Sequence, residues 1–524
     1  MEFHRGPSAQ QEALSNPIIL TEILKQSSIP LKTCRLVSHF WNKMVLTLPN
    51  TKLALNLKPR HQNFGTDPAP FFELCNTLDD RLAKRISART PFFAEASYSF
   101  AAKMIYLCGK FSQRVESLGI LLHFEDCLPH ISQIFSNSCP NLKQLRIRCM
   151  FDGENYVPSP EILAAPFPRK PNLTVFRLHS AELAVSPALT TFTQLVVAAA
   201  PNLKKLVLPW GVYPDLENSK FLDSLTLKLD LARSLEVVLR DYKPSELARM
   251  LGQVGDHVVH LAFSCYGSYN KYSKHEDYDL VDNSTRSRIR LPGRMLKLRT
   301  FKNDMLDIIQ HADLWRDIEG MPGLETLWIG KISRTATSVD AFLKNLSEKE
   351  RVFRKVTDLR IQELYDPTLL ARLKTAFPNL KTLGLDSLYE MEEGGMELGV
   401  VLKACVGWGG LKHLRVRLPT YPERMWDFIK ALLDGSELYK GLKSLQIKAH
   451  GGYFTRRDLT DAEMYLFKGL LVVMKEIDHV NIRDLYFGGE SLKNILDFMA
   501  SNGISLSKFK VLQGGRTDNV NDFE

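Results

Sequence analysis

Arginine residues stand two positions apart in several short apolar segments of the 524-residue chain. The clearest pairs are Arg146 with Arg148 and Arg415 with Arg417, each with one apolar residue between them. A guanidinium group donates paired hydrogen bonds to a carboxylate or a phosphate, and residues two apart on a strand face the same way. The chemistry that these pairs indicate is therefore the binding of an anionic group.

Sequence motifs of common catalytic centres are absent. The chain has no GxxxxGK[ST] phosphate loop, no GxSxG elbow, no HExxH zinc motif and no GxGxxG between a strand and a helix. The nearest approach to a metal cluster is His123, Cys127, His130 and Cys139, and its spacing fits no standard zinc site. We therefore expect no catalytic residues, no metal and no cofactor.

The segments that carry the paired arginines belong to an internal repeat. The phrase Pro-Asn-Leu-x-x-ϕ-x-ϕ, in which ϕ is apolar, starts at Pro140, Pro171, Pro201 and Pro378. Without the Pro-Asn prefix the set grows to fourteen units, spaced by about 30 residues on average. The units start at Val115, Leu142, Leu173, Leu203, Leu222, Val258, Leu298, Leu324, Val356, Leu380, Leu411, Leu442, Ile477 and Leu506.

Each unit combines two periodicities. Its ϕ-x-ϕ tail alternates with period two, which is typical of a half-buried strand, and stretches with helical spacing lie between units. One strand and one helix per unit predict an α/β solenoid.

The repeat resembles the leucine-rich repeat in its long, helix-containing form, in which a Cys-Pro-Asn-Leu phrase opens the strand, as at residues 139 to 142. The resemblance covers about residues 111 to 515 and implies a leucine-rich-repeat superhelix that binds proteins. The chain departs from the family where shorter repeats carry an asparagine after the strand; those positions hold Met150, Gly211, Ile332, Leu364, Leu388 and Pro419. An ordinary α/β protein with similar strands is the alternative.

Period-two alternation also predicts which side chains face away from the core. Counted from the first residue of each unit, positions +2, +4 and +6 point to the predicted concave face. These 42 positions hold thirteen lysines or arginines and three aspartates, in a chain whose net charge is +9. We predict a basic face that holds an acidic or phosphorylated segment. The predicted substrate-binding residues are Arg146, Arg148, Arg177, Lys205, Arg360, Arg415, Arg417, Lys448 and Arg483.

The same positive charges allow two other interpretations of the predicted basic face. The face could be a solvated sheet surface that favours long cationic side chains. Nucleic acid is the less favoured partner, because these strand positions offer one aromatic residue, Trp328, and not a row of stacking platforms.

Before the repeats lies a short segment with two apolar helical patterns. Pro17 starts the first helix, the second begins near Pro30, and Trp41 follows after a short break. About 35 residues are too few to form a sufficient core alone. The segment therefore docks on the rest of the chain or presents its apolar side chains to a partner.

The residues of this segment resemble the F-box, which attaches substrate receptors to the Skp-family adaptor of SCF-type ubiquitin ligases. The marks are Pro17 with a Glu-Ile-Leu element, and an Arg-Leu-Val-Ser-x-x-Trp ending at Trp41. The resemblance implies that the chain binds this adaptor and, through it, a cullin. The adaptor-facing or module-packing residues would be Pro17, Ile18, Leu20, Ile23, Leu24, Leu36, Val37 and Trp41.

The segment departs from the F-box pattern at two places. Asn16 replaces the usual leucine, and the link between the two marks is about one residue short. The alternative is a helical cap that seals the first apolar edge of the repeats.

The sequence thus predicts a small all-α module in front of a solenoid. The expected parts are a flexible tail at 1–15, the F-box-like helical module at 16–48, the start of the array at 49–110, the repeat array at 111–515 with a polar insertion at 268–294, and a flexible tail at 516–524. Within the start of the array we expect a strand at 53–57 and helical material around 71–86 and 92–107.

The predicted function is that of a substrate-recognition subunit of an SCF-type ubiquitin ligase, without enzyme activity of its own and with an unknown protein substrate. A repeat scaffold with no ubiquitin role is the alternative. Eight cysteines without a CxxC pair, no signal-peptide-like start and no apolar run of ~20 residues indicate a cytoplasmic or nuclear protein that does not contact a membrane.

Overall fold

The structure is a computed structural model. It describes residues 9–26, 29–48, 54–57, 69–91, 95–123, 125–150, 165–180, 186–230, 242–266, 289–306, 309, 311, 313–331, 339–348, 351–387, 397–451, 458–483 and 485–509. The chain divides into two compact units, Met1–Val254 with Tyr266–Tyr269, and Gly255–Cys265 with Asn270–Glu524.

The first unit begins with a group of short helices and continues with alternating strands and helices. Its elements are α1 (Ala9–Ser15), α2 (Pro17–Leu24), α3 (Leu31–Cys34), α4 (His39–Thr47), β1 (Leu55–Leu57), α5 (Ala69–Thr77), η1 (Asp80–Lys84), β2 (Arg85–Arg89), α6 (Glu95–Lys110), β3 (Ser117–Leu122), η2 (Glu125–Cys127), α7 (Leu128–Asn137), β4 (Gln144–Cys149), β5 (Val175–Ser180), α8 (Pro187–Ala199), β6 (Lys205–Pro209), β7 (Ser224–Asp230) and α10 (Pro244–Val254).

The second unit continues the alternation of strands and helices. Its elements are β8 (His260–Tyr266), β9 (Thr300–Asn303), α11 (Leu314–Glu319), β10 (Thr326–Ile329), α12 (Val339–Glu348), β11 (Asp358–Gln362), α13 (Leu369–Ala376), β12 (Thr382–Asp386), α14 (Leu398–Cys405), β13 (His413–Thr420), α15 (Met425–Asp434), α16 (Ser436–Tyr439), β14 (Ser444–Gly451), α17 (Asp461–Val473), η5 (Met474–Glu476), β15 (His479–Ile482), α18 (Gly489–Ser501) and η6 (Leu506–Lys508).

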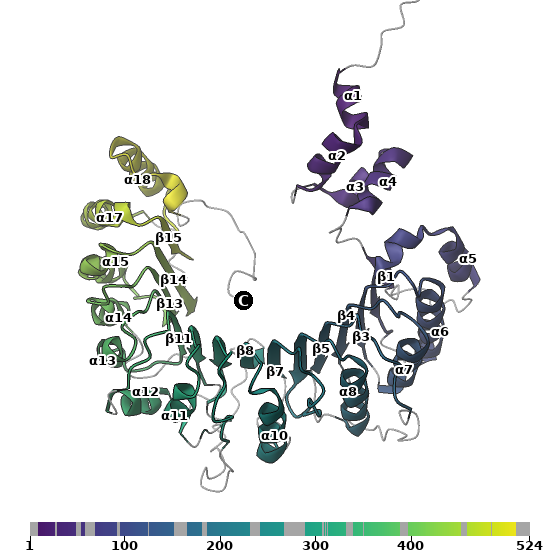
Figure 1. The fold of residues 1–524 in the computed structure, drawn as a ribbon. Helices are drawn as coiled ribbons and strands as arrows, with labels where there is room; N and C mark the ends of the chain where they lie inside the picture. The colour runs from purple at the N-terminus through teal and green to yellow at the C-terminus, as the bar shows by residue number, and fades with distance from the viewer. Residues whose placement is uncertain are drawn as a thin grey trace, which may run out of the picture. The chain divides into compact units, whose positions relative to one another are not determined.

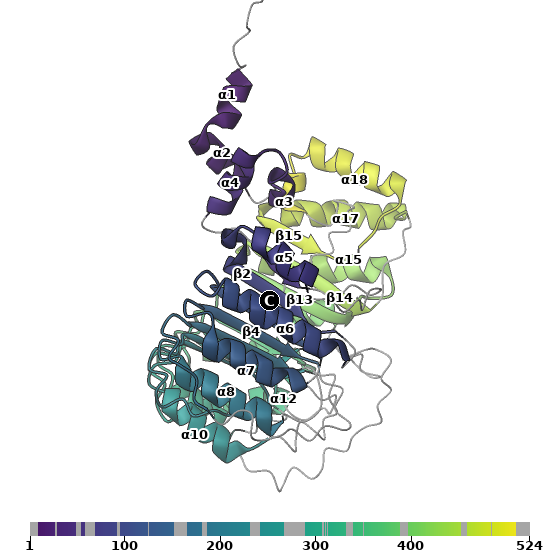
Figure 2. The ribbon, with the colours of Figure 1, turned by 90° about the vertical axis from the view of Figure 1, so that its right-hand side faces the viewer.

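The strands of each unit are parallel and follow one another in chain order, β1 to β7 in the first unit and β8 to β15 in the second. In each unit the helices between the strands lie on one face of the strands, as Figures 1 and 2 show. We call the opposite strand face, which no helix of the described residues covers, the open face. The predicted solenoid-like α/β arrangement is confirmed. One helix per repeat does not hold throughout, because the link between β6 and β7, residues 210–223, contains no helix.

The apolar positions of the repeat phrase form the core. In β4 and the turn before it, Leu142, Leu145 and Ile147 are all at most 1% exposed. Leu145 lies opposite Leu118 of β3 and Phe176 of β5, so equivalent residues stack from strand to strand. Burying such rows of leucine-sized side chains is the main stabilising contribution to each repeat.

The asparagine of the Pro-Asn-Leu phrase ties one repeat to the one before it. The side-chain nitrogens of Asn141, Asn202 and Asn379 each donate to a backbone carbonyl of the preceding repeat, at 2.9, 2.9 and 2.8 Å. Asn172 instead reaches the side-chain oxygen of Asn141 at 3.4 Å. The recurring phrase thus encodes both the buried leucine and the link to its neighbour.

The units with the weakest sequence signal form strands in the register counted from the sequence. Those that start at Leu222, Leu298 and Ile477 give β7, β9 and β15, each aligned residue by residue with an adjacent strand. The unit at Leu506 differs, because Leu506–Lys508 is a 3-10 helix and Phe509, the last residue described, makes a parallel bridge to β15.

Three further segments differ from the expectation. Residues 9 to 15, assigned to a flexible tail, form helix α1. Residues 85 and 86, assigned to helical material, begin strand β2. Ile289 and Leu291, assigned to the polar insertion, are buried, and Ile289 bridges to His311. Residues 267–288 and the tail at 516–524 lie outside the described residues.

Candidate functional site

The parallel register places the open-face side chains of the first unit in three rows across the strands. The middle row runs Ser87, Gly119, Arg146, Arg177, Val207, Thr226; the row before it runs Arg85, Ser117, Gln144, Val175, Lys205, Ser224. The third row holds Arg89, Leu121, Arg148 and His179 on β2 to β5, and Pro209 opposite Lys228 on β6 and β7.

The lysines and arginines of β4 to β7 form what we call the basic cluster. His179 of β5 lies near them but is not counted in it. The cluster consists of Arg146, Arg148, Arg177, Lys205 and Lys228. Arg146 and Arg148 are exposed, and the other three are half-buried. Arg146 and Arg177 are register partners on neighbouring strands.

The cations of the basic cluster repel one another's charge. Burial, followed by the charges of Arg177 and Arg146, lowers the pKa of Lys205. Burial, followed by Lys228 and the neighbouring arginines, lowers the pKa of His179 to about 4. The imidazole is therefore neutral at physiological pH, and the positive potential comes from the lysines and arginines.

Carboxylates are missing from these three rows. None of the described residues that make up the rows on β2 to β7 is an aspartate or a glutamate. Asp230, the last residue of β7, follows beyond the paired register.

Arg85 and Arg89 of β2 extend this surface, and the sequence reasoning missed them. Arg89 Nε lies 3.4 Å from His123 Nε2. The signal that could have found them is the alternation in Arg85-Ile86-Ser87-Ala88-Arg89. It is weak because Ala88 gives the strand little apolar side chain at its second inward position.

The open face of the second unit carries a different charge pattern. Its three carboxylates, those counted from the sequence, each form an ion pair with a cation of the same face. The pairs are Lys302 with Asp304 at 3.0 Å, Arg360 with Asp358 at 3.5 Å, and Arg417 with Asp386 at 2.9 Å. Arg360 and Arg417, predicted substrate contacts, are thus partly neutralised by their own chain.

Trp328 of β10 connects two of these cations. Lys302 Nζ lies 3.6 Å and Arg360 Cζ lies 4.8 Å from the centroid of its ring. Lys302 and Arg360 are its register partners on the strands to either side. Such cation–π contacts hold both side chains against the sheet, so the indole is already occupied by the chain's own cations.

The other predicted substrate-binding residues of the second unit lie on two adjacent strands and directly after a third. Arg415 and Lys448 are half-buried on β13 and β14, and Arg483 follows β15. Burial and then the charge of Arg360 lower the pKa of Arg415, whereas Asp358 opposes the shift. Gly384 lies between Arg360 and Arg415, and a Cβ there would approach Arg360 Cγ to 3.1 Å.

The N-terminal helices form a second candidate site. Leu20, Leu24 and Val45 form their small buried core together with Cys34 and Leu48, and Trp41 packs against it. Of the predicted adaptor set, Leu20 and Leu24 are therefore buried, Ile23 and Trp41 are partly exposed, and Pro17, Ile18, Leu36 and Val37 are exposed.

The N-terminal segment exposes several large apolar side chains to solvent. Ile18 is 74% exposed, Leu36 86% and Val37 60%, and Ile19 and Phe40 are also exposed. We call these five residues the apolar patch. Several large exposed apolar side chains within so short a segment are compatible with a protein interaction site.

Polar residues of the same segment have local structural roles. The Asn16 side chain caps α2 and accepts hydrogen bonds from the backbone N–H groups of Ile18 and Ile19. Ser38 caps α4 and accepts from the backbone N–H of Trp41 at 3.2 Å. The Asn16 departure from the F-box pattern is thus a good helix cap.

Other kinds of site find little support in the described residues. No group of three or more His, Cys, Asp or Glu in the described part of the chain could hold a metal ion. No described helix combines the length and the apolar character that crossing a bilayer requires.

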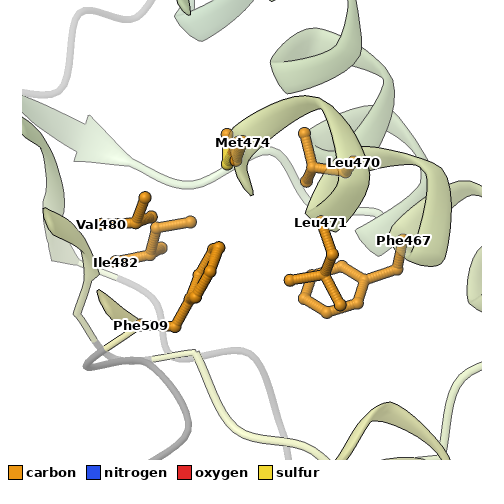
Figure 3. Close-up of a pocket in the computed structure, with 7 residues that line it drawn as sticks. All are labelled: Phe467, Leu470, Leu471, Met474, Val480, Ile482 and Phe509. Carbon is orange, nitrogen blue, oxygen red and sulfur yellow. The ribbon is translucent and has the colours of Figure 1, made fainter. Parts of the chain in front are cut away.

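A small apolar cavity lies in the second unit beside α17 and β15 (Figure 3). Its volume is about 10 Å³, room for about one water molecule. The residues around it are Phe467, Leu470, Leu471, Met474, Val480, Ile482 and Phe509. This cavity is a packing gap and too small for a ligand.

Comparisons with known proteins assign the chain to no family. No family model matches the chain, and no curated protein matches it. Among solved structures, one that matches is a Bacteroides fragilis protein determined by a structural genomics consortium, at 13% identity and a TM-score of 0.30. That match covers 53% of this chain and 64% of the Bacteroides fragilis protein.

Proposed function

We propose that the chain is a substrate receptor of an SCF-type ubiquitin ligase. In this proposal the N-terminal helices are an F-box that binds a Skp-family adaptor and, through it, a cullin. The strand–helix repeats are leucine-rich repeats that hold a protein target with an acidic or phosphorylated segment. The chain contributes proximity and orientation, and the catalytic residues belong to other subunits.

The apolar patch is the observation that carries the proposal. Ile18, Leu36 and Val37 are the three most exposed large apolar residues among the described residues 9–48, and each falls at a position that the F-box resemblance assigns to the adaptor or to module packing. A cap on the repeats would bury such side chains against the first strands. Their exposure favours a partner outside the chain.

The repeats support the receptor role through their open face. Solenoids commonly bind partners along an extended strand face, and here that face carries the basic cluster. Charge complementarity favours an anionic segment of the target.

Binding of the purified Skp-family adaptor tests the proposal. We expect Leu36→Ala with Val37→Ala to weaken adaptor binding by at least about tenfold, because two exposed apolar contacts are removed. Leu74→Ala is the matched control: Leu74 is 58% exposed on α5 and lies outside the apolar patch. These are surface truncations, so the melting temperature should not change.

Two outcomes would overturn the proposal. One is a wild-type chain that does not bind the adaptor. The other is equal loss of binding in the double variant and in the Leu74 control. Either result would favour the alternative, a repeat scaffold without a ubiquitin role.

A further inference from the structure

We propose that Cys139 and Cys108 of the first unit are a redox-active pair, in which the Cys139 thiolate reacts with hydrogen peroxide and Cys108 then closes a disulfide with it. Neither cysteine belongs to the open face or to the apolar patch. The proposal is independent of the proposed function, because it requires neither an adaptor nor a target.

The two cysteines belong to consecutive repeats and meet in the interior of the first unit. Cys108 lies near the end of α6, and Cys139 lies in the turn between α7 and β4. The Cys139 sulfur is 4.0 Å from the Cys108 carbonyl oxygen, and the two thiol groups are hydrogen-bonded to each other. Cys108 is 0% exposed and Cys139 is 1% exposed. Contact between two cysteine side chains is the first requirement for a disulfide.

The backbone of Cys139 has a conformation that suits glycine better than cysteine. Its φ is +57°, in the left-handed region, and it follows Ser138, the C-cap of α7. Glycine is the usual residue at such a position, because a Cβ there adds steric strain. The backbone N–H of Cys139 donates to Ser112 Oγ at 2.9 Å, which ties this turn to the segment after α6. The turn thus holds the Cys139 sulfur near Cys108 at a cost in strain.

A buried lysine supplies the positive charge that a thiolate needs. Lys170 is 3% exposed, and its Nζ donates a 2.6 Å hydrogen bond to the carbonyl of Ser138, the residue next to Cys139. Burial lowers the pKa of Lys170, and the negative charge of Cys139 opposes that shift. An ammonium group removed from water requires a counter-charge, and the Cys139 thiolate provides it.

The same contacts give the two cysteines different roles. The hydrogen bond from the Cys108 thiol lowers the pKa of Cys139 against the effect of burial, and the charge of Lys170 adds to the lowering. That hydrogen bond and burial both raise the pKa of Cys108. The thiolate is the nucleophilic form of cysteine. Cys139 is therefore the attacking sulfur, and Cys108, which keeps its proton, is the resolving one.

The oxidation balances with hydrogen peroxide as the oxidant. The Cys139 sulfur attacks one peroxide oxygen and the O–O bond breaks, which gives a sulfenic acid and a hydroxide ion. The hydroxide takes a proton from Lys170 and leaves as water. The Cys108 sulfur then attacks the Cys139 sulfur, the S–O bond breaks, and the hydroxyl group leaves with the Cys108 proton as a second water molecule. Lys170 is left neutral, the form that burial favours.

Cys405 of the second unit is a matched control within the same chain. It is buried on α14 and also lies near a lysine, Lys374. Burial nevertheless raises its pKa to about 12, and in the described part of the chain no thiol hydrogen-bonds to it. We therefore expect Cys405 to resist the oxidant.

The test exposes the purified, reduced full chain to hydrogen peroxide at neutral pH. Hydrogen peroxide is chosen because the burial of both sulfurs excludes a bulky oxidant. Free thiols are then alkylated in denaturant, and non-reducing peptide mapping by mass spectrometry identifies the linked peptides. We expect a disulfide between Cys108 and Cys139, formed at least about tenfold faster than any oxidation of Cys405. This step uses the wild-type chain, so it does not depend on the folding of a variant.

Variants separate the roles of the three side chains. In Cys108→Ala the sulfenic acid at Cys139 should persist and be trapped by dimedone, and in Cys139→Ala neither product should form. Lys170→Met should slow disulfide formation by at least about tenfold, because the thiolate loses its counter-charge, and Lys170→Arg should slow it less. Cys405→Ala should react as the wild type does. Melting temperatures show which variants fold.

Three results would overturn the inference. They are a wild-type chain in which Cys108 and Cys139 are both alkylated after the peroxide treatment, a disulfide from either residue to a different cysteine in equal yield, and oxidation of Cys405 at the rate of Cys139. Adaptor binding by the reduced chain is measured separately and does not depend on any of these results, so the failure of one proposal is distinguishable from the failure of the other.

Discussion

Asp386 and Arg417 lie on neighbouring strands of the second unit, and the Asp386 carboxylate accepts a hydrogen bond of 2.9 Å from Arg417 Nη1. Burial raises the pKa of Asp386, even though the charge of Arg417 acts to lower it. Arg417 therefore compensates a carboxylate that burial alone would make costly. Its first role is structural, although its position also suits a contact with a target.

Removing this guanidinium should make stability depend on pH. Arg417→Gln leaves the Asp386 carboxylate half-buried without its cation, and we expect the free energy of unfolding at pH 7 to fall by about 2 kcal/mol. An aspartate whose folded pKa is raised loses stability as the pH rises through that pKa, so the deficit should shrink as the pH falls toward 4. Urea unfolding at several pH values measures it. Arg415→Gln, on the same strand, should have little effect; an equal loss there would contradict the assignment.

His179 should reduce stability in mild acid. Its pKa in the folded chain is about 4, lowered from 6.5 by burial and by the nearby cations. Between these two values the unfolded chain binds the proton and the folded chain does not, so the free energy of unfolding falls as the pH falls. We expect His179→Asn to lose less stability than the wild type between pH 6.5 and 4, and to match its pH dependence above pH 7. Parallel pH dependence of the two proteins throughout would show that His179 titrates normally.

Trp328 should stabilise the second unit through its two cations. Truncation in Trp328→Ala removes contacts with Lys302 Nζ at 3.6 Å and with Arg360 at 4.8 Å, together with apolar packing. We expect a loss of about 2 kcal/mol. Trp426, 41% exposed on α15, is the control, and its replacement by alanine should cost much less. Thermal unfolding measures both, and equal losses would mean that the cation–π contacts contribute nothing measurable.

The asparagine of the repeat phrase should stabilise the link between repeats. Asn202→Ala removes the 2.9 Å hydrogen bond to the Pro171 carbonyl, and we expect a loss of about 1 kcal/mol. Asn172→Ala removes only a 3.4 Å contact between side chains and should have a smaller effect. Urea midpoints compare the two variants; a larger loss for Asn172 would show that the phrase acts in another way.

The strands could be predicted from the sequence because the signal lies in one short phrase. Leucine, two more apolar residues and the Pro-Asn turn determine where each strand starts and which side chains it buries, and even the unit at Leu298, with Phe301 and Asn303 inside, keeps the register. Strand β2 could not be found, since its inward residues are Ile86 and the small Ala88. The 3-10 turn at Leu506 was missed because the same spacing of apolar residues suits both conformations.

The site could be predicted in part. Alternation along the strands placed Arg146, Arg177 and Lys205 on one face, which requires no knowledge of neighbouring strands. The neutralisation of Arg417 by Asp386 could not be read from the pattern, because these residues are 31 positions apart and meet through strand pairing. The other two ion pairs of that face, Lys302 with Asp304 and Arg360 with Asp358, join residues two positions apart in the sequence.

The order of the strands has a consequence for how the chain is made. Inside each unit the described strands pair only with strands of adjacent repeats, and the asparagine link also points to the repeat already made. A repeat can therefore dock as soon as it leaves the ribosome, without waiting for a distant segment. The basic cluster, complete at Lys228, would be assembled on the nascent chain while more than half of the protein remained to be translated.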